Sequence, residues 1–271
     1  MKINVGGLIV EKENVTVSIQ NRAFFNGDSV KEVLRVVHGE IVDWEDHYFN
    51  LMASMRIFRM NIPLSFTPEF FQEQIHQVLK ANEVTNGKIT FFVYRQANEH
   101  LVDASIDYIV RVDPCENAWE YYNQPSEIDV YKDYAINPSF YALVNAQKPE
   151  EYIAEIYQLE NDYADLILLN PNKRMARTLK GSIYILKDGI IKTPKAEEGV
   201  ITSVMRNNFI KKLKQSDSYE VEELEIFPFE IQKADELFVL IDGEGILSIT
   251  QNRKKIYTTT ETEKLFHQFF I

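Results

Sequence analysis

Hydrophobic positions recur every second residue along much of the chain, and stretches with the three- to four-residue spacing of helices separate these runs. In the first part of the chain, the alternating runs predict strands over 3–10, 15–19, 33–37, 40–42, 88–94 and 108–112. The first two strands flank a polar turn, and the next two flank His38-Gly39, so each pair predicts a hairpin. Helical spacing predicts one helix over 44–59, with Asp43 as its N-cap, and another over 68–81.

The remainder of the chain continues the same mixture of periods. Alternating or fully apolar runs predict strands over 128–131, 141–144, 166–169, 183–186, 190–191, 221–226, 237–241 and 246–249. The segment Lys187-Asp188-Gly189 predicts a hairpin turn. One helix is predicted to begin at Pro149, because the first helical position does not need its N–H group. Further helices are predicted over 200–213 and at the C-terminal end. The apolar face of the helix after Pro149 comprises Tyr152, Ile153, Ile156, Tyr157 and Leu159.

The segment 113–117, Asp-Pro-Cys-Glu-Asn, breaks the periodic pattern. It predicts a boundary between an N-terminal domain over 1–114 and a C-terminal domain over 115–271. Strand runs outnumber helices, and few strand–helix–strand repeats occur. This arrangement favours an α+β protein of two domains.

Composition excludes several classes of protein. The 271 residues include 29 Lys and Arg against 41 Asp and Glu, a net charge of −12, so the chain would repel a phosphate backbone and we expect no nucleic-acid partner. A single cysteine excludes an internal disulfide framework, and the five scattered histidines lack metal-ligand spacing. No apolar run approaches the ~20 residues of a membrane span, and the N-terminus lacks a signal-peptide pattern. We therefore expect a cytoplasmic protein without a membrane partner.

A series of short strings carries a family resemblance through its joint order and spacing. The strings are Asn26–Val36, Gly39, His47 with Leu51 and Ser54, Leu168–Asn170, Arg177, Ser182–Tyr184, Lys187–Gly189, Gly199–Arg206, Val221–Glu223 and Ala234–Phe238. The series resembles the class IV aminotransferases, which include branched-chain and D-amino acid aminotransferases and 4-amino-4-deoxychorismate lyase. The resemblance implies the two-domain fold of the fold-type-IV, D-amino acid aminotransferase-like enzymes. It also implies a homodimer, with pyridoxal phosphate (PLP) in a cleft between the domains.

Such an enzyme needs an amine that forms an imine with PLP, groups that hold the phosphate, and a partner for the pyridine nitrogen. Lys148 precedes Tyr152-Ile153 by four residues, and the resemblance assigns it the place of the Schiff-base lysine. The alternative is that Lys148 is an exposed lysine in front of a helix. Arg206 and the backbone N–H of Val204 are the candidate phosphate ligands that remain.

Several positions depart from the family pattern around the phosphate. The resemblance implies an arginine three residues after His47, where this chain has Asn50. The family's Gly-Ile-Thr-Arg turn reads Ser203, Val204, Met205 and Arg206 here, so the hydroxyl of the threonine is replaced by a thioether. After the strand over 237–241 the family supplies threonine hydroxyls, whereas this chain has Asp242, whose carboxylate would repel a phosphate dianion.

The partner of the ring nitrogen also differs. The resemblance implies a glutamate five residues before an asparagine, and these positions hold Arg177 and Ser182. An arginine stays protonated and cannot accept the pyridinium proton. Lys31 stands where the family usually has an aromatic residue.

These departures favour a family member with lost or weakened PLP binding. It would be a pseudoenzyme, or a protein that binds a different acidic or zwitterionic small molecule in the interdomain cleft through Lys31, Lys148, Arg177 and Asp242. One alternative is an active PLP-dependent aminotransferase or aminodeoxychorismate lyase that uses Lys148. Another is a dimeric interaction module without a ligand. An open cleft would favour ligand binding, and a filled cleft would favour the interaction module.

Overall fold

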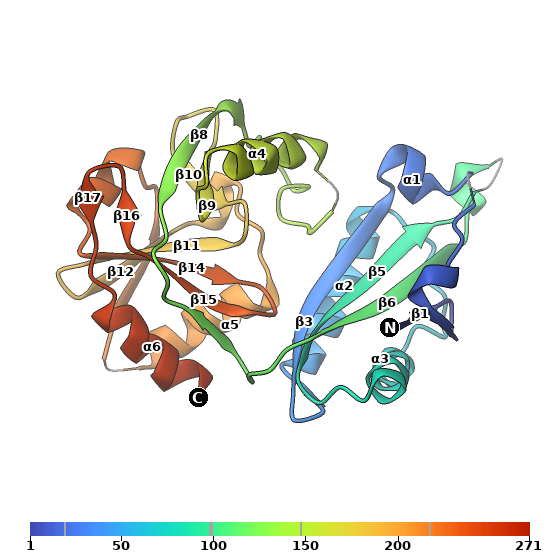
Figure 1. Ribbon diagram of the computed structural model, residues 1–271. Coiled ribbons are helices and arrows are strands. Elements are labelled where there is room, and N and C mark those ends of the chain that lie inside the picture. Colours follow the sequence, from blue (N-terminus) through green and yellow to red (C-terminus); the bar gives the residue numbers. More distant parts are fainter. Residues whose placement is uncertain (19, 98–99, 147, 217) are drawn as a thin grey trace. The chain divides into compact units, whose positions relative to one another are not determined.

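The computed structural model describes residues 1–18, 20–97, 100–146, 148–216 and 218–271. Contacts divide the chain into two compact units, and Figure 1 labels most of their helices and strands. Unit 1 comprises Met1–Ala118 with Asn145 and Ala146, and unit 2 comprises Trp119–Val144 and Lys148–Ile271. The contacts thus change unit between Ala118 and Trp119, and the domain boundary after residue 114 stays a prediction. No helix within the described ranges is both long and apolar enough to cross a membrane.

Unit 1 is built on one antiparallel sheet with the strand order β2-β1-β6-β5-β3-β4. Its strands are β1 (Lys2–Val5), β2 (Leu8–Glu11), β3 (Ser29–Val37), β4 (Glu40–Ile41), β5 (Gly87–Arg95) and β6 (Ile106–Pro114). Its helices are η1 (Lys12–Asn14), α1 (Arg22–Asn26), α2 (Trp44–Ile57), α3 (Pro68–Asn82) and η2 (Leu101–Asp103). The long helix α2 packs on β3, and α3 packs on β1 and β6. Phe71, Ile75 and Phe91 are buried between these helices and the sheet.

The first hairpin differs from the prediction. Its turn is Gly6-Gly7, with Val5 opposite Leu8, rather than the polar segment 11–14. Gly6 and Gly7 have φ angles of 57° and 93°, which glycine adopts without steric cost and which suit a two-residue hairpin turn. Residues 15–18 therefore form no strand, and the last residue of that predicted strand, residue 19, lies outside the described residues.

The second hairpin and both long helices of unit 1 are confirmed, with one correction at a cap. The turn His38-Gly39 joins β3 to β4. Asp43 occupies the N-cap position of α2 but makes no side-chain capping bond. Its φ of 49° departs from the extended conformation in which an N-cap side chain reaches the first-turn N–H groups.

Unit 2 contains a six-stranded sheet, β13-β12-β11-β14-β15-β7, a three-stranded sheet, β10-β9-β8, and a small hairpin, β16-β17. Its strands are β7 (Glu120–Tyr122), β8 (Ile128–Ala135), β9 (Asp165–Leu169), β10 (Met175–Thr178), β11 (Ser182–Lys187), β12 (Ile190–Pro194), β13 (Glu220–Leu224), β14 (Glu236–Ile241), β15 (Gly245–Ile249), β16 (Gln251–Asn252) and β17 (Lys255–Ile256). Its helices are α4 (Pro149–Glu160), η3 (Ala196–Glu198), α5 (Val204–Gln215), η4 (Pro228–Lys233) and α6 (Thr260–Phe270).

The two faces of the six-stranded sheet carry separate cores. Ile183, Leu237 and Val239 pack against Ile128 and Ile167 of the three-stranded sheet. On the opposite face, side chains of the sheet pack against α5 and α6, with Tyr184, Phe209, Phe238, Leu265 and Phe266 at the centre. Because both faces are covered, β11 and β14 are apolar at almost every position.

Two predicted elements of unit 2 differ in the structure. Residues 141–144 form turns instead of a strand. Ala142 and Val144 are buried, as the alternation requires, but their N–H groups bond to the carbonyls of Ser139 and Tyr141 within the same segment. The helix predicted over 200–213 begins only at Val204, where Ser203 caps it. Strand β10 was not predicted.

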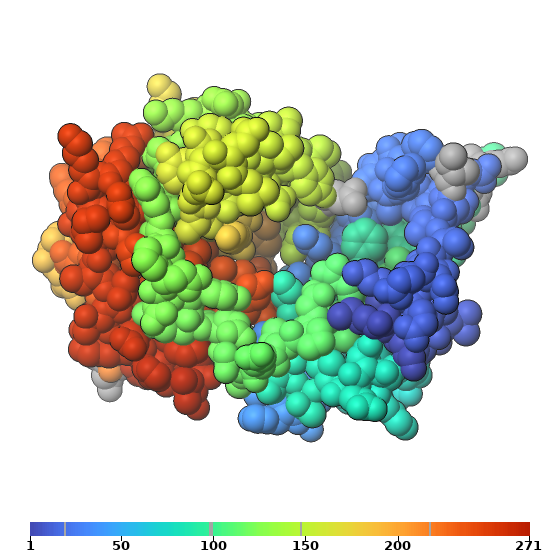
Figure 2. Space-filling view, in the orientation of Figure 1, coloured from blue at the N-terminus to red at the C-terminus, as the bar shows by residue number. Residues whose placement is uncertain are grey.

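Helix α4 begins at Pro149, as predicted, but most of its apolar face is not buried. The helix contacts β8 and β9 and buries Ala154 and Gln158. Its opposite side lies at the surface of unit 2, coloured yellow-green in Figure 2. That side carries four exposed apolar side chains, Tyr152, Ile153, Ile156 and Leu159.

Candidate functional site

The start of α5 holds an acidic side chain from the loop after β14. Ser203 caps the helix, because its Oγ accepts a hydrogen bond from the N–H of Arg206 at 3.2 Å. The same hydroxyl donates to Oδ1 of Asp242 at 2.5 Å. Val204 and Met205, the first residues of the helix, are buried. A helix N-terminus carries partial positive charge, so it stabilises the Asp242 carboxylate.

Arg206 links elements in the interior of unit 2 through hydrogen bonds. Its side chain is buried, and Nη2 donates to the carbonyl of Pro194 at 2.8 Å and to Oε2 of Glu223 at 3.2 Å. Glu223 also accepts a bond from Lys214 at 2.8 Å. The guanidinium therefore ties α5 to β12 and β13. The neighbouring Tyr184 is fully buried, and burial raises the pKa of its hydroxyl.

Arg177 lies on β10 in a buried ion pair. Nη2 of Arg177 contacts Oε1 of Glu151, in the first turn of α4, and Nη1 donates to the carbonyl of Gly199 at 2.8 Å. In the same turn, Glu150 accepts a bond from the Tyr134 hydroxyl at 2.9 Å. Burial, together with this bond, raises the pKa of Tyr134 to about 12. Ser182 begins β11 opposite Leu240 and is buried.

Lys148 occupies the N-cap position of α4 and is half-buried. Its Nζ donates to the carbonyl of Val144 at 3.1 Å, and its own carbonyl accepts the N–H of Glu151 at 2.9 Å. Thr202, just before α5, donates to the carbonyl of Leu143 at 3.4 Å. Lys148 is thus bonded to Glu151 of the Arg177–Glu151 pair and to Val144, and the neighbouring Leu143 is bonded to the segment that leads into α5. The structure brings these predicted residues into one part of unit 2.

Two further predicted positions lie in unit 1. On α2, the Nδ2 of Asn50 donates to Oε2 of Glu32 at 2.9 Å, and Nδ1 of His47 contacts Oε1 of the same carboxylate at 2.7 Å. Glu32 and His47 are buried, so this network forms part of the packing between α2 and β3. Lys31 precedes Glu32 on β3, and its N–H donates to the carbonyl of Asn145 at 2.9 Å.

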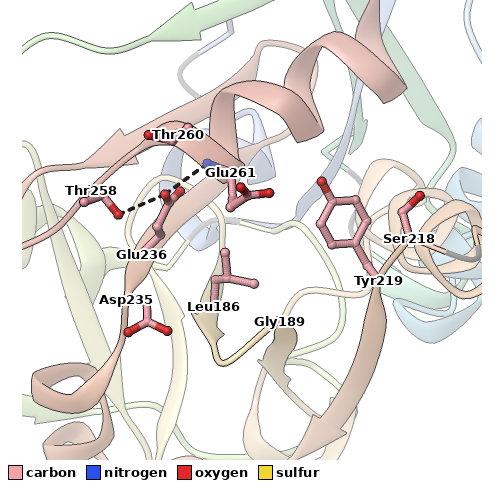
Figure 3. Close-up of a pocket in the computed structure, with 9 residues that line it drawn as sticks. All are labelled: Leu186, Gly189, Ser218, Tyr219, Asp235, Glu236, Thr258, Thr260 and Glu261. Atoms are coloured by element: carbon pink, nitrogen blue, oxygen red, sulfur yellow. Dashed lines mark hydrogen bonds between the residues drawn. The ribbon is translucent and has the colours of Figure 1, made fainter.

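A hollow of about 430 Å³ elsewhere in unit 2 is lined by carboxylates that are bonded within the chain, chiefly Glu236 (Figure 3). Glu236 accepts bonds from the hydroxyl of Thr258 at 3.0 Å, from the N–H of Glu261 at 3.0 Å, and from the N–H and hydroxyl of Thr262, each at 2.8 Å. This buried carboxylate therefore caps α6. Asp235, at the rim, accepts the N–H of Asp188 at 2.9 Å.

Comparison with known proteins identifies the family. The family model described as amino-transferase class IV matches residues 29–251. The chain belongs to the class IV aminotransferase family. A relative named probable branched-chain-amino-acid aminotransferase, from Aquifex aeolicus, is 25% identical over 263 residues, which cover 92% of this chain and 84% of the relative. The D-alanine aminotransferase of Staphylococcus epidermidis is 22% identical over 257 residues, which cover 92% of this chain and 88% of that protein.

The fold agrees with solved structures of this family. The branched-chain amino acid aminotransferase of Thermobaculum terrenum in its PLP form superimposes with a TM-score of 0.86 at 19% identity, covering 98% of this chain and 92% of that one. The prediction of an α+β protein with the fold-type-IV architecture is confirmed.

Two residues of the site were missed by sequence reasoning in this class IV protein. Glu32 had a usable signal, because it interrupts the buried face of β3 between Val30 and Leu34, and a buried carboxylate needs partners. Glu151 had none. It lies far from Arg177 in sequence, and an acidic residue in the first turn of a helix is ordinary.

Proposed function

We propose that this chain is a class IV aminotransferase-family protein that does not carry out PLP-dependent catalysis. The observation that carries the proposal is the hydrogen bond between Ser203 and Asp242 at the start of α5. The resemblance places the cofactor phosphate at this helix end. Here the same helix end is already occupied by a carboxylate of the chain itself.

The charge balance at α5 disfavours a phosphate. A helix N-terminus contributes roughly half a positive charge, which one carboxylate already offsets. A phosphate dianion beside Asp242 would face like-charge repulsion, or would require the carboxyl group to take up a proton. Arg206 offsets little of this repulsion, because Nη2 of its guanidinium is bonded to the carbonyl of Pro194 and to Glu223, although its buried Nε has no hydrogen-bond partner among the described residues. The residues at this helix end do not fit the phosphate of PLP.

The contacts of Arg177 support the same proposal. A ring nitrogen that must stay protonated needs an acceptor, and a guanidinium offers none. Arg177 is moreover held by Glu151 and by the carbonyl of Gly199. The contacts of Lys148 and Arg177 also weaken the idea that these cations hold another acidic or zwitterionic ligand, since such a ligand would have to displace partners of the chain itself.

A second candidate is an active aminotransferase or lyase that uses Lys148. Membership of the family favours it, as do the relatives, which are named as aminotransferases. The solved relative in its PLP form shows that homologues bind this cofactor. The homodimer and the cytoplasmic location are likewise proposals, and the homodimer rests on the family resemblance.

An absorbance spectrum of the purified protein with PLP separates the two candidates. We expect no visible imine band at a large excess of PLP. A band that appears in the wild-type protein and disappears in Lys148→Ala would refute the proposal and establish the second candidate.

Equilibrium dialysis with PLP adds a readout that does not depend on imine formation. Asp242→Asn removes the carboxylate charge and keeps a side chain of the same size. We expect it to lower the Kd for PLP about tenfold, as the removal of one like-charge contact predicts. Asp188→Asn makes the same change in an exposed turn and should leave the Kd unchanged. Equal affinity in all three proteins would show that Asp242 does not oppose the phosphate.

A further inference from the structure

Unit 2 carries a groove of about 1120 Å³ on the side of β8 that includes Tyr131 and Tyr134. It is formed by β8, by the turn between β9 and β10, by η4 and by the β16–β17 hairpin. Lys148, Arg177, Ser203 and Asp242 do not line it. The groove is therefore separate from the place where the family resemblance puts PLP.

Aromatic and aliphatic side chains form the walls of the groove. Phe227 and Phe229 stack on each other with ring centroids 5.8 Å apart, and their exposed fractions are 39% and 61%. Tyr131, Leu169 and Ile231 are among the other apolar side chains that line the groove. Exposed aromatic rings gathered in one concavity provide surface for a planar apolar ligand.

The charged side chains around the groove are predominantly basic, although the chain carries a net charge of −12. Lys132, Lys173, Arg253 and Lys254 line it, and Asp129 is the acidic residue among the lining side chains. Asp129 already contacts Arg253 at 3.3 Å. Within the described part of the chain, no salt bridge joins the three lysines to an acidic group. A local excess of positive charge on an acidic protein indicates an anionic ligand.

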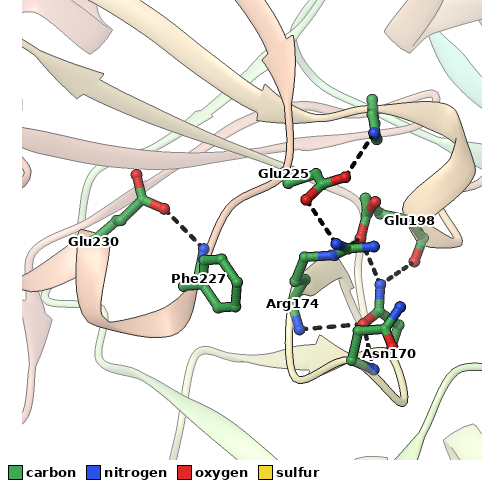
Figure 4. Close-up of polar contacts among 8 residues, drawn as sticks. Asn170, Arg174, Glu198, Glu225, Phe227 and Glu230 are labelled. Carbon is green, nitrogen blue, oxygen red and sulfur yellow. Dashed lines mark hydrogen bonds and ion pairs between the residues drawn. The ribbon is translucent and has the colours of Figure 1, made fainter.

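Hydrogen bonds hold the walls of the groove in place. Asn170 accepts the N–H groups of Asn172 and Arg174, and its Nδ2 donates to Oε2 of Glu198 at 2.6 Å (Figure 4). This bonding fixes the turn that presents Lys173. Arg174 then bridges Glu198 at 2.7 Å and Glu225 at 2.6 Å.

The aromatic wall is fixed in a similar way. Phe227 donates its N–H to Glu230 at 2.9 Å, which caps η4, and the carbonyl of Ile226 accepts the N–H of Met175 at 2.8 Å. Asn252 joins the β16–β17 hairpin to β8 by donating to the carbonyl of Ile128 at 2.6 Å. A site whose walls are already ordered loses less conformational entropy when a ligand binds.

We propose that this groove binds a small aromatic carboxylate. The planar ring of the ligand packs against Phe227 and Phe229, and its carboxylate is held by the lysines at the rim. An apolar body with a single anionic group matches an apolar concavity with a basic edge, whereas a neutral or cationic ligand leaves the lysine charges unused. The proposal does not depend on whether the chain binds PLP.

Isothermal titration calorimetry on the full chain tests the proposal with a matched pair of probes, 2-naphthoate and the neutral 2-naphthamide. We expect 2-naphthoate to bind at least about tenfold more tightly, which corresponds to ~1.4 kcal/mol. Lys173→Glu should raise the Kd for 2-naphthoate about tenfold and leave that for 2-naphthamide nearly unchanged. Phe229→Ala should weaken both probes. Circular dichroism would confirm that each variant is folded.

Control variants locate the site. Lys211→Glu makes the same charge change on the exposed surface of α5, and Ile153→Ser removes an exposed apolar side chain from α4. Neither should alter the Kd. The proposal is overturned if 2-naphthoate does not bind at millimolar concentration, if both probes bind equally, or if the control variants weaken binding as much as Lys173→Glu does.

Discussion

Replacing Asp165 by asparagine should stabilise unit 2 at neutral pH and have little effect near pH 4. Asp165 is fully buried at the start of β9, and burial raises the pKa of its carboxyl from 3.8 to about 6. Its Oδ1 accepts the N–H groups of Leu166 at 2.7 Å and of Lys180 at 3.3 Å. An asparagine side chain retains an oxygen for both bonds and carries no charge into the core.

The pKa difference gives the size and the sign of the effect. Between about pH 4 and pH 6 the unfolded chain has released the Asp165 proton and the folded chain still holds it. The free energy of unfolding of the wild-type protein therefore falls as the pH rises through this window. A difference of about two pKa units corresponds to about 3 kcal/mol at pH 7 and above. The Asp165→Asn variant has no such carboxyl group, so its free energy of unfolding does not fall for this reason as the pH rises.

Urea unfolding at several pH values between 4 and 7.5 measures the effect. Trp44→Phe leaves Trp119 as the remaining tryptophan, so fluorescence then reports on unit 2. Asp188→Asn serves as a control, because Asp188 is exposed in a turn. The gain in stability of Asp165→Asn should grow from near zero at pH 4 to its full value above pH 6. A gain that does not change with pH, or a loss at pH 7.5, would refute the reasoning.

Two further predictions concern stability. Glu236→Ala should lower the free energy of unfolding by about 3 kcal/mol, because it leaves buried donors of Thr262 and its neighbours without an acceptor, and urea denaturation would measure the loss. A free energy of unfolding within about 0.5 kcal/mol of wild type, the size of an ordinary surface effect, would show that water replaces the carboxylate. Gly181→Ala should impair folding, since the new Cβ would lie 2.0 Å from the carbonyl oxygen of Leu240. Gly189 has a φ of 81° but open space around it, so Gly189→Ala should lower the free energy of unfolding by only about 1 kcal/mol. Similar thermal midpoints for the two alanine variants would contradict this account.

The elements that the sequence predicted well are those with a long, one-sided pattern or a specific turn. Helices α2 and α3 have such patterns, and His38-Gly39 and Asp188-Gly189 are turns that suit positive φ. Strand β10 was missed because it is only four residues long and carries Arg177 in a buried position. The burial of that arginine depends on Glu151, and no local pattern reveals a partner so distant in the chain.

Residues 3–10 show a second reason why the sequence pattern did not predict an element correctly. Apolar residues stand on both sides of Gly6-Gly7 with no polar break, so the run was predicted as one strand, and only the backbone freedom of the two glycines indicates the turn. The positions of the candidate site came from the family resemblance, and their contacts came from the structure. That Asn50 bonds to Glu32, and Asp242 to Ser203, depends on tertiary packing that the sequence pattern does not contain.

The Arg177–Glu151 pair constrains the order in which substitutions can accumulate. A single change of Arg177 to the glutamate of the family pattern would place two carboxylates side by side in a largely buried position, with no cation between them. A change of Glu151 alone would leave the guanidinium of Arg177 with only the carbonyl of Gly199 among its described partners. Either first step costs stability, and only the double change restores balance. A return to the family's glutamate by single substitutions would therefore pass through a less stable protein. This explains how Arg177 persists once both residues have changed.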